Sequence, residues 1–549
     1  MLVDGSGFKQ GELELHRLET DSHAIYWKGL VYMDGCEAGP ASIRRFASSL
    51  SDVAKASIAL RGTYFVLVRD KLSGDTFAFV DQTGLFHAFA SDTTISTSLL
   101  ELAADEKLAF PDMDPEAVAD FLSYGYLTFG RTLFTAIRRI QPEQVACISP
   151  RTSVVMRARP VRPLGATPTH TVEEVLRNLA TAARGDRVSV DLTGGVDTRI
   201  VAVTLDYFGV PFEVAHAGLK GNRDMEIAAE LAHVLKRDLV ITYHNVEDFD
   251  SVLPELFTVC DGLLDVAKDH LGLQMQHDRL ARGVSLVVTG DGGTLHKDHY
   301  WLHDFPFYAK RCTDVDKLIR YRVAPIEPNY AIFAPFWEKI ARTYRARARD
   351  FVQNLVAGRN TETFDQVYFH LHTRDNLGRF STNHVRLLNV HSPLADRDAV
   401  TASYHLPRSM RFFNRFHRES LTRLNPAAAR VRTSEGGVSA SAEWSKITAD
   451  LSKYAADKLL RMRKKLAQRF LNQPYKQQVP VSGSLHPKMR SCSVMKDAVE
   501  NLRDRQILNS SVTLENLPNT YLGTVLTLHL TLLQLEGIVG STHAAGKRA

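Results

Sequence analysis

Short apolar runs alternate with helical patterns from about residue 170 onward, and this alternation constrains the fold more than any other feature. Helical patterns cover 172–184, 198–209 and 223–236, and strand patterns cover 187–193, 211–218 and 238–244. Strands that alternate with helices in this way predict a doubly wound parallel sheet. Ligands of such sheets bind in a crevice beyond the carboxyl ends of the strands. The turns that follow these strands are therefore the first places to look for a site.

Residues 1–160 have a different pattern, in which short aromatic and β-branched runs are separated by Gly and Asp turns. Such runs, for example 23–35 and 61–84, are typical of antiparallel sheets. Three prolines and little apolar periodicity make 157–170 the predicted linker. A chain of 549 residues is too long for one core. We therefore expect two domains, residues 1–160 and residues 170–549, the second with a mostly helical C-terminal part.

The composition is that of an ordinary soluble protein, with 44% hydrophobic residues, 23% charged residues and a net charge of +5. The charges are spread along the chain, which gives little support for a nucleic-acid partner. Five scattered cysteines without a CxxC or Cys/His cluster predict reduced thiols and no zinc site. No apolar signal segment opens the sequence, and Tyr521–Gly540 carries enough polar residues to predict a core helix rather than a membrane span. The expected location is the cytoplasm.

A basic segment, residues 457–470, places the apolar residues Leu459, Met462, Leu466 and Phe470 on one helical face. A solvated amphipathic helix is the simplest interpretation of this pattern. A helix that binds a protein partner or a membrane surface is the alternative, so the sequence leaves a protein partner open.

Two glycines and an aspartate, Gly194, Gly195 and Asp197, follow the first strand of the predicted parallel sheet. A helix begins directly after them, and its free N–H groups and partial positive charge face the turn. Glycines let a phosphate approach the backbone closely because no Cβ intervenes. A carboxylate would repel a bare anion, but it has a role if Mg²⁺ bridges it to phosphate oxygens. The segment, flanked by Thr193 and Thr198, is either a plain tight turn or a pyrophosphate–Mg²⁺ site.

A second strand, within 284–288, ends in the same kind of turn, TGDGG at residues 289–293, which again joins glycines to an acid, Asp291. The carboxyl ends of parallel strands lie at one edge of a sheet, so the two turns are expected to converge on one crevice. This convergence favours a nucleotide site over a plain turn. The spacing differs from both the Walker A and the dinucleotide-binding fingerprints.

The first turn, VDLTGGVDTRI, resembles the SGGxDS pyrophosphate loop of the asparagine synthetase family of ATP pyrophosphatases. The segments LRGTYFVLVRD and VDQTGLFHAFAS are similar to the family's LxGxFAFxxxD and DxxGxxPLYY, in the same order. Segments 121–144 and 373–398 also resemble the family, so the likeness runs from about residue 55 to about residue 400. It implies an Ntn-hydrolase-like, antiparallel N-terminal domain and a C-terminal ATP pyrophosphatase domain. Family members adenylate a carboxylate with ATP, release pyrophosphate, and let an amine displace AMP.

Carried over residue by residue, the resemblance implies roles for both turns. The implied pyrophosphate and adenosine contacts are Leu192, Thr193, Gly194, Gly195, Thr198, Val214, Thr289 and Gly290. Asp197 would hold Mg²⁺, and Asp291 stands where the family has a Glu near the reacting centre. Arg430 and Arg432 lie near the position of the family's catalytic Lys, and we expect Arg432 to stabilise anionic charge there. The implied cofactors are ATP and Mg²⁺.

Two departures from the family bear on activity. The family's glutaminase uses an N-terminal cysteine whose thiol and α-amine act together, whereas position 2 here is Leu2 and Cys36 is internal. We therefore expect no glutamine hydrolysis by the N-terminal domain. In the second turn Thr294 and Leu295 replace two acids of the family's SGEGxDE, and Asp298 could compensate from a little further along the chain.

Two functions stay open at this point. The first is an ATP-dependent amide synthetase that takes its amine or ammonia from elsewhere, as in family relatives without the cysteine: lasso-peptide cyclases, β-lactam synthetases and polysaccharide-cluster amidotransferases. Its substrate would be a small-molecule, sugar-acid or peptide carboxylate in bacterial natural-product or polysaccharide biosynthesis. The second is a nucleotide-binding pseudoenzyme or assembly factor without turnover.

His296 and His299 beside Asp298 could ligate a metal, although such a loop is usually a surface feature.

Overall fold

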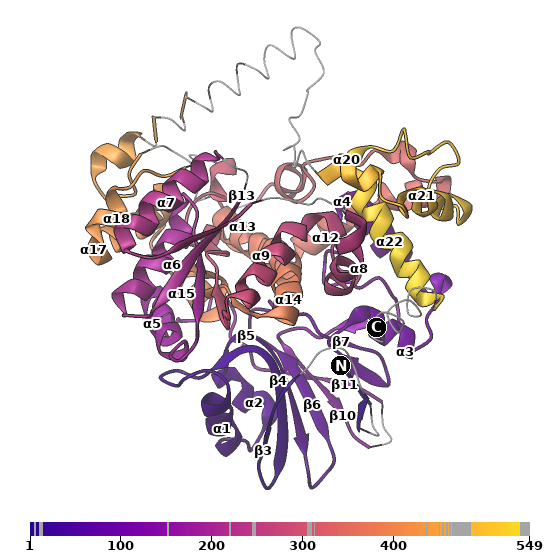
Figure 1. Ribbon diagram of the computed structural model, residues 1–549, viewed down its shortest axis with the longest axis horizontal. Coiled ribbons are helices and arrows are strands. Elements are labelled where there is room, and N and C mark those ends of the chain that lie inside the picture. Colours follow the sequence, from indigo (N-terminus) through magenta and orange to yellow (C-terminus); the bar gives the residue numbers. More distant parts are fainter. Residues whose placement is uncertain are drawn as a thin grey trace.

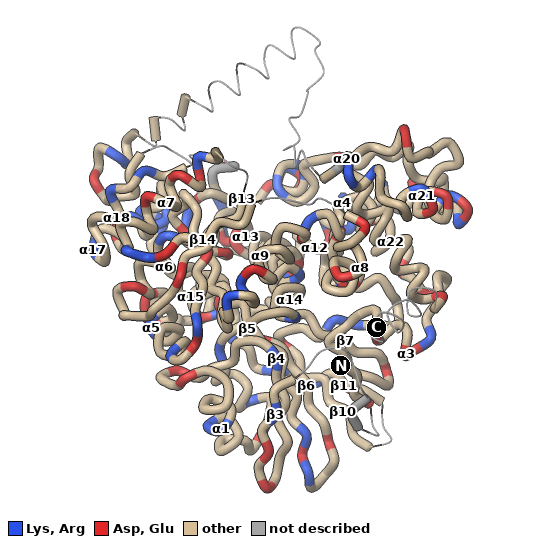
Figure 2. The backbone as a smooth tube through the Cα atoms, in the orientation of Figure 1, with Lys and Arg blue, Asp and Glu red and all other residues tan. Residues whose placement is uncertain are grey.

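The computed structural model describes residues 1–4, 7–9, 15–150, 153–218, 221–243, 249–304, 310–311, 313–434, 438–449 and 485–537, with isolated residues between 451 and 463. Most of the basic segment 457–470 lies outside the described residues. Figure 1 shows the N-terminal sheets at one end of the molecule, with the parallel sheet and a group of C-terminal helices side by side above them. Figure 2 shows acidic and basic residues interspersed along the backbone rather than gathered in one block.

Two antiparallel sheets form the N-terminal part, in the strand orders β2-β1-β8-β7-β9 and β11-β10-β6-β5-β4-β3. Their strands are β1 (Leu2–Asp4), β2 (Gly7–Lys9), β3 (His16–Glu19), β4 (His23–Tyr32), β5 (Arg61–Asp70), β6 (Thr76–Val80), β7 (Phe89–Ala90), β8 (Thr94–Ser96), β9 (Arg138–Arg139), β10 (Gln144–Ile148) and β11 (Val155–Ala158). Side chains alternate across β5. Phe65 and Leu67 share a core with β1 and β8, whereas Val66 and Val68 pack with helix α1 (Pro40–Ser48). The predicted antiparallel sandwich is confirmed.

The parallel sheet has the strand order β14-β13-β12-β15-β16, and all four pairings are parallel. Its strands are β12 (Val188–Asp191), β13 (Phe212–Gly218), β14 (Leu239–Tyr243), β15 (Leu286–Val288) and β16 (Asn389–His391). Its helices are α5 (Val172–Ala182), α6 (Val196–Tyr207), α7 (Arg223–Leu235), α8 (Phe249–Cys260) and α9 (His270–Ala281). The strand order reverses between β12 and β15, which makes this the switch point of the sheet, where ligands of such folds bind. The predicted doubly wound sheet is confirmed, with β16 as an additional strand.

Helices make up most of the remaining chain. They are α2 (Val53–Ala56), α3 (Leu99–Asp105), α4 (Pro115–Tyr124), α10 (Val315–Leu318), α11 (Pro335–Ala341), α12 (Tyr344–Gln353), α13 (Asn360–Val367), α14 (Gly378–Leu387), α15 (Arg397–Tyr404), α16 (Arg408–Arg411), α17 (Arg415–Leu424), α18 (Pro426–Arg430), α20 (Leu485–Arg490), α21 (Met495–Asp504) and α22 (Leu522–Leu535). A π-helical segment, Tyr368–Leu377, joins α13 to α14.

The C-terminal helix α22 is buried along most of its length, as predicted for that apolar stretch. Its leucines share one apolar core with residues of α3 and α4 of the N-terminal part and of α8 of the parallel-sheet part, so α22 packs against both parts. No helix within the described ranges is long and apolar enough to cross a membrane.

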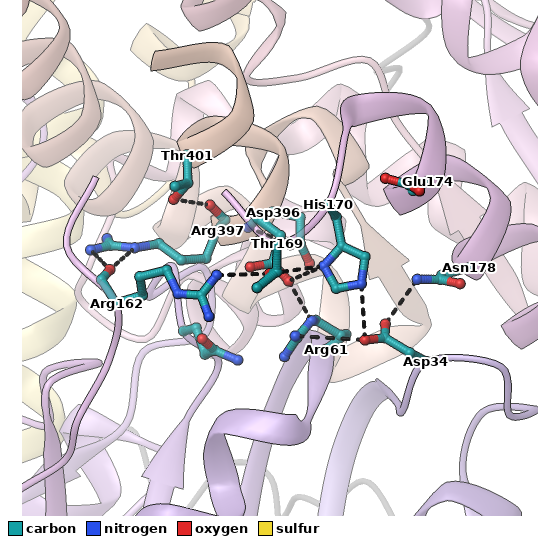
Figure 3. A network of polar contacts seen from close by, with 12 residues as sticks. Asp34, Arg61, Arg162, Thr169, His170, Glu174, Asn178, Asp396, Arg397 and Thr401 are labelled. Carbon is teal, nitrogen blue, oxygen red and sulfur yellow. Dashed lines mark hydrogen bonds and ion pairs between the residues drawn. The ribbon is translucent and has the colours of Figure 1, made fainter. Parts of the chain in front are cut away.

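A polar network joins the N-terminal sheets to the parallel-sheet part (Figure 3). Arg61 Nε lies 2.6 Å from Asp398 Oδ2, and the His170 ring lies 3.4 Å from Asp398 and 3.2 Å from Asp34. Asn178 Nδ2 donates a hydrogen bond to Asp34 Oδ1 at 2.9 Å. The network therefore connects β5, the predicted linker, α5 and α15 at one place, and it fixes how the two parts sit together.

Candidate nucleotide site

The first loop connects β12 to α6 and is held by its own side chains. The Thr193 N–H donates to Thr198 Oγ1 at 3.1 Å, and the two threonine hydroxyl oxygens are 3.1 Å apart. The Gly195 N–H donates to Thr193 Oγ1 at 3.1 Å, and Gly195 occupies the N-cap position of α6. The predicted threonines thus shape the loop around the start of the helix.

The two glycines of this loop face different surroundings. A Cβ on Gly194 would lie 2.7 Å from Asp224 Oδ1 and 2.8 Å from Ser434 Cβ, and the Gly194 carbonyl accepts the Ser434 N–H at 3.1 Å. Gly194 is therefore required by close packing against other parts of the chain. A Cβ on Gly195 would approach only Thr193 Oγ1, at 3.2 Å. Of the two, Gly195 leaves its open side for a ligand.

The second loop, which follows β15, rests directly on the first turn of α6. A Cβ on Gly290 would lie 2.5 Å from the Thr198 backbone nitrogen, and one on Gly293 would lie 2.2 Å from Asp197 Cγ. Both positions exclude any larger residue unless α6 moves away. The expected convergence of the two loops is confirmed by these contacts and by the direct pairing of β12 with β15.

The carboxylate of Asp197 is paired with a lysine of the second loop. Lys297 Nζ donates to Asp197 Oδ2 at 2.7 Å, and His417 Nε2 of α17 lies 3.1 Å from Asp197 Oδ1. The side chain of Lys297 is only 7% exposed, against 23% for Asp197. Burial alone would raise the pKa of Asp197, but the Lys297 ammonium and His417 hold it well below the ordinary value. Asp197 is therefore a carboxylate at neutral pH, with its charge compensated from within the chain.

Asp291 has the opposite electrostatic character. It follows β15 as an exposed residue, and Thr289 Oγ1 donates to its Oδ2 at 3.0 Å. Its pKa is raised, first because the surrounding chain displaces solvent and then because the carboxylate of Asp191 lies nearby. Thr289 Oγ1 also lies 2.8 Å from Ser392 Oγ beyond β16. The predicted residues Thr289 and Asp291 thus share one hydrogen-bonded group at the crevice.

Leu192 and Val214 lie in the apolar core between the sheet and its helices, with side chains that are fully buried. The Leu192 N–H donates to the Ala215 carbonyl at 2.9 Å, and the Leu192 carbonyl lies 2.8 Å from His216 Nδ1. Neither residue therefore presents accessible surface to a nucleotide in this structure. Their assignment to adenosine stays a prediction.

Arg432 lies on the segment that covers the first loop. Its Nη2 donates to Glu226 Oε2 of α7 at 3.2 Å, and its own side chain is 46% exposed. The Arg432 carbonyl accepts a hydrogen bond of 2.8 Å from Arg199, a buried residue of α6 that also donates to the Val431 carbonyl at 2.7 Å. Burial lowers the pKa of Arg199 to about 10, which leaves it charged at neutral pH. Arg199 therefore fixes the position of the Arg432 segment beside the first loop.

The residues present do not fit a Mg²⁺ ion bound at Asp197. Among the described residues there is no group of three or more His, Cys, Asp and Glu side chains that could hold a metal. The Asp197 carboxylate already faces a buried ammonium, and a divalent cation in the same place would have to displace it against like-charge repulsion. Asp298 makes its backbone hydrogen bond to Arg411, and burial raises its pKa to about 6. The prediction of Mg²⁺ at Asp197 stays untested, and no step below depends on it.

The segment around His296 is a packed one. His296 is fully buried, its Nε2 lies 2.8 Å from the Leu394 carbonyl, and burial lowers its pKa to about 3, so the ring is neutral. Thr294 follows Gly293 in a short 3₁₀ turn. The two positions where the family has acids, Thr294 and Leu295, thus carry no charge.

A doubly wound α/β fold with a glycine-rich loop at the switch point of its sheet is typical of nucleotide-binding proteins. A sequence model of the family described as Asparagine synthase matches residues 172–491, more than half of the chain. The chain therefore belongs to the asparagine synthase family, whose members use ATP and whose ATP pyrophosphatase domain indicates adenylation-type amide synthesis by a ligase. No curated protein matches the chain.

Three residues at the site were not predicted from the sequence as part of it: Lys297, His417 and Arg199. Lys297 lies in a segment that the sequence singled out for its histidines, so its neighbours drew attention away from it. His417 is distant in sequence and carries no local motif. Arg199 directly follows the glycine–aspartate turn, and a buried arginine must find several acceptors, which was a usable signal.

Proposed function

We propose that the chain is an ATP-dependent, amide-bond-forming synthetase that adenylates a carboxylate and releases AMP and pyrophosphate. The amine or ammonia that attacks the adenylate would come from outside the chain's own N-terminal domain. The observation that carries the proposal is the contact between the two loops, Gly290 on Thr198 and Gly293 on Asp197. This contact supports one site in which the first loop receives the phosphates and Asp291 faces the reacting carboxylate.

In this proposal the first loop binds the pyrophosphate part of ATP. The open side of Gly195 and the N-terminus of α6 offer backbone N–H groups and a partial positive charge. Thr193 and Thr198 keep the loop in shape through their hydroxyl groups. Catalysis would come mainly from positioning and from charge stabilisation as pyrophosphate leaves.

Arg432 would contribute positive charge at the edge of the same site. Its backbone is held beside the first loop by Arg199, and its side chain forms an ion pair with Glu226 of α7. Asp291, with its raised pKa, would repel an incoming carboxylate less than an ordinary aspartate does. Leu192, Val214, Thr289 and Gly290 would surround adenosine, which requires the fully buried Leu192 and Val214 to become accessible to the ligand.

The acceptor would be a small-molecule, sugar-acid or peptide carboxylate in a cytoplasmic biosynthetic pathway for a bacterial natural product or polysaccharide. ATP–pyrophosphate exchange with a panel of such carboxylates tests the proposal. We expect exchange that requires both the carboxylate and Asp291, with Asp291→Asn slowing it by at least about a hundredfold, a size typical of removing one polar group from a reacting centre. Exchange that Asp291→Asn leaves unchanged would contradict the assignment of the reacting centre.

The proposed domains are residues 1–160 and a synthetase domain of residues 170–549. The N-terminal domain would serve as a structural support for the second loop. Thr83 Oγ1 donates to the Ala395 carbonyl at 3.0 Å, and Ala395 is the residue that a Cβ on Gly292 would touch. The polar network shown in Figure 3 lies close by in the sequence, where Arg61 of β5 pairs with Asp398, three residues after Ala395. Contacts from the N-terminal sheets thus reach the loop that carries Asp291.

The same proposal excludes glutamine hydrolysis by the N-terminal domain. Leu2 is buried in β1, and Cys36 lies in a turn where Arg45 Nη1 approaches its sulfur at 3.1 Å. Purified protein should release no ammonia from glutamine. Release that disappears in Cys36→Ala would overturn this part of the proposal, and Cys147→Ala, at a buried thiol, is the matched control.

A nucleotide-binding pseudoenzyme or assembly factor is the second candidate. The observation that favours it is the absence of charge at Thr294 and Leu295, together with the pairing of Asp197 to Lys297. Retained ATP binding, with no exchange for any carboxylate in the panel, would favour this candidate over the synthetase.

A further inference from the structure

The pairing of Asp197 with Lys297 removes an electrostatic obstacle in the first loop. An uncompensated carboxylate in the first turn of α6 would repel the phosphates that the loop is proposed to bind. A divalent cation at the carboxylate is one solution, and an ammonium group is another. Here the ammonium is present, 2.7 Å from Asp197 Oδ2.

The position of Lys297 is fixed by its neighbours on both sides. On one side the His296 ring is held against the Leu394 carbonyl at 2.8 Å. On the other side the Asp298 N–H donates to the Arg411 carbonyl at 3.1 Å, and Arg411 Nη2 donates back to the Lys297 carbonyl at 3.2 Å. These bonds hold the Lys297 backbone in place, so only the rotamer freedom of its side chain is lost when its ammonium pairs with Asp197.

The second loop is also shaped for this approach. Gly293 has no Cβ, and any Cβ there would lie 2.2 Å from Asp197 Cγ. The glycine therefore lets the chain pass beside the carboxylate before it reaches Lys297. Positions 294 and 295 carry a threonine and a leucine, so these two positions add no carboxylate beside the ammonium.

We propose that Lys297 takes the place of a divalent cation at Asp197, so that the first loop binds pyrophosphate groups without a metal ion held by the protein. The inference rests on the proposed function, because it concerns the charge of the same pyrophosphate site. Lys297 acts as a positioning residue: it neutralises Asp197 and leaves the N–H groups at the start of α6 to meet the anion.

Isothermal titration with inorganic pyrophosphate, in buffer with EDTA and in buffer with Mg²⁺, tests the proposal. We expect the wild-type protein to bind in EDTA, with a dissociation constant within about threefold of that in Mg²⁺, a difference of under 1 kcal/mol. Lys297→Met should weaken binding in EDTA by at least about tenfold, because it leaves Asp197 uncompensated. Mg²⁺ should restore binding to this variant by pairing with the exposed carboxylate.

The double variant Asp197→Asn with Lys297→Met keeps the loop neutral without either charge. It should recover binding in EDTA to within about threefold of wild type. This recovery would show that the loss of binding in Lys297→Met comes from the uncompensated charge and not from misfolding. Lys317→Met is the matched control, since it removes a lysine from another ion pair of the same domain, 2.8 Å from Asp304. Its binding should equal that of wild type in both buffers.

Wild-type binding that requires Mg²⁺, and that Lys297→Met leaves unchanged, would overturn the role of Lys297 while leaving the proposed function intact. A double variant as weak in EDTA as the single variant would also overturn it. If no protein binds pyrophosphate or ATP in either buffer, the proposed function itself fails.

Discussion

The two loops at the carboxyl edge of the parallel sheet have the same composition and opposite electrostatics. Each follows a buried strand, and each combines glycines with one aspartate. Asp197 in the first loop is paired with Lys297, and its pKa is lowered below the ordinary value. Asp291 in the second loop has Asp191 nearby and a raised pKa. A glycine-acid turn thus defines where a site lies, and the surrounding side chains decide what its acid can do.

The difference follows from which partners reach each acid. Lys297 approaches Asp197 from the second loop and compensates its charge, and His417 of α17 lies 3.1 Å from the other carboxylate oxygen. Asp291 receives a hydrogen bond from its own loop, through Thr289, and no ion pair of Asp291 appears within the described part of the chain. The first loop is therefore suited to holding an anion with fixed charge, and the second to a group whose charge responds to its surroundings.

Breaking the compensated pair should have the largest effect on stability. Asp197→Ala leaves the buried Lys297 ammonium without this carboxylate, and we expect the free energy of unfolding to fall by about 3 kcal/mol at pH 7. Adding Lys297→Met should return most of that loss. Chemical denaturation of the three proteins measures it, and a double variant no more stable than Asp197→Ala would contradict the pairing.

The pH dependence of this loss has a definite sign. The folded-state pKa of Asp197 is lowered, so its contribution is present above the unfolded pKa of about 3.9 and declines as the pH falls below it. The stability difference between wild type and Asp197→Ala should therefore shrink in acid. A difference that grows as the pH drops from 6 to about 3 would contradict the lowered pKa.

Alanine substitutions of Gly290 and Gly195 distinguish a glycine needed for packing from one needed for ligand binding. Their effect on the free energy of unfolding should be intermediate. Gly290→Ala forces a Cβ to within 2.5 Å of the Thr198 nitrogen and should cost about 1–3 kcal/mol of unfolding free energy. Gly195→Ala meets only Thr193 Oγ1 at 3.2 Å and should change stability by less than about 0.5 kcal/mol. It should nevertheless weaken pyrophosphate binding, measured by titration. Equal losses of stability at both glycines would remove the distinction between them.

Replacing the acid of the second loop should have the smallest effect on stability. The raised pKa of Asp291 means that its ionised form is disfavoured in the folded state at pH values above about 3.9. Asp291→Asn should therefore stabilise the protein slightly at pH 7, by no more than about 0.5 kcal/mol, because the accessible side chain is screened by water. The gain should disappear below pH 4, as denaturation midpoints across pH will show. A loss of stability at pH 7 would mean that the carboxylate is favourably paired.

Local patterns were sufficient to predict most of this architecture. The alternation of strands and helices from 172 to 243 depends on periodicity within each segment, and the structure follows it closely. β16 was not predicted because it is only three residues long. The π-helical segment 368–377 was not predicted because an apolar pattern does not distinguish a π-helix from an α-helix. Short elements gain their stability from neighbours rather than from their own sequence.

The placement of the two loops was predictable, and their electrostatics were not. Parallel strands fix which ends share an edge, so the convergence of Gly194–Asp197 with 289–293 followed from topology alone. The Asp197–Lys297 pair joins residues 100 positions apart and depends on the exact path after Gly293. Leu192 and Val214 show a different limit of motif matching. Each position matches a binding motif of the family, but its side chain lies in the core.

The central claim is that both loops form one nucleotide site, and a crystal structure of the protein with bound ATP tests it most directly. We predict density for the triphosphate against Gly195 and the N-terminus of α6, with the α-phosphate on the side of Gly290 and Asp291. A nucleotide bound away from the β12–β15 switch point, or phosphates that contact neither loop, would contradict the account.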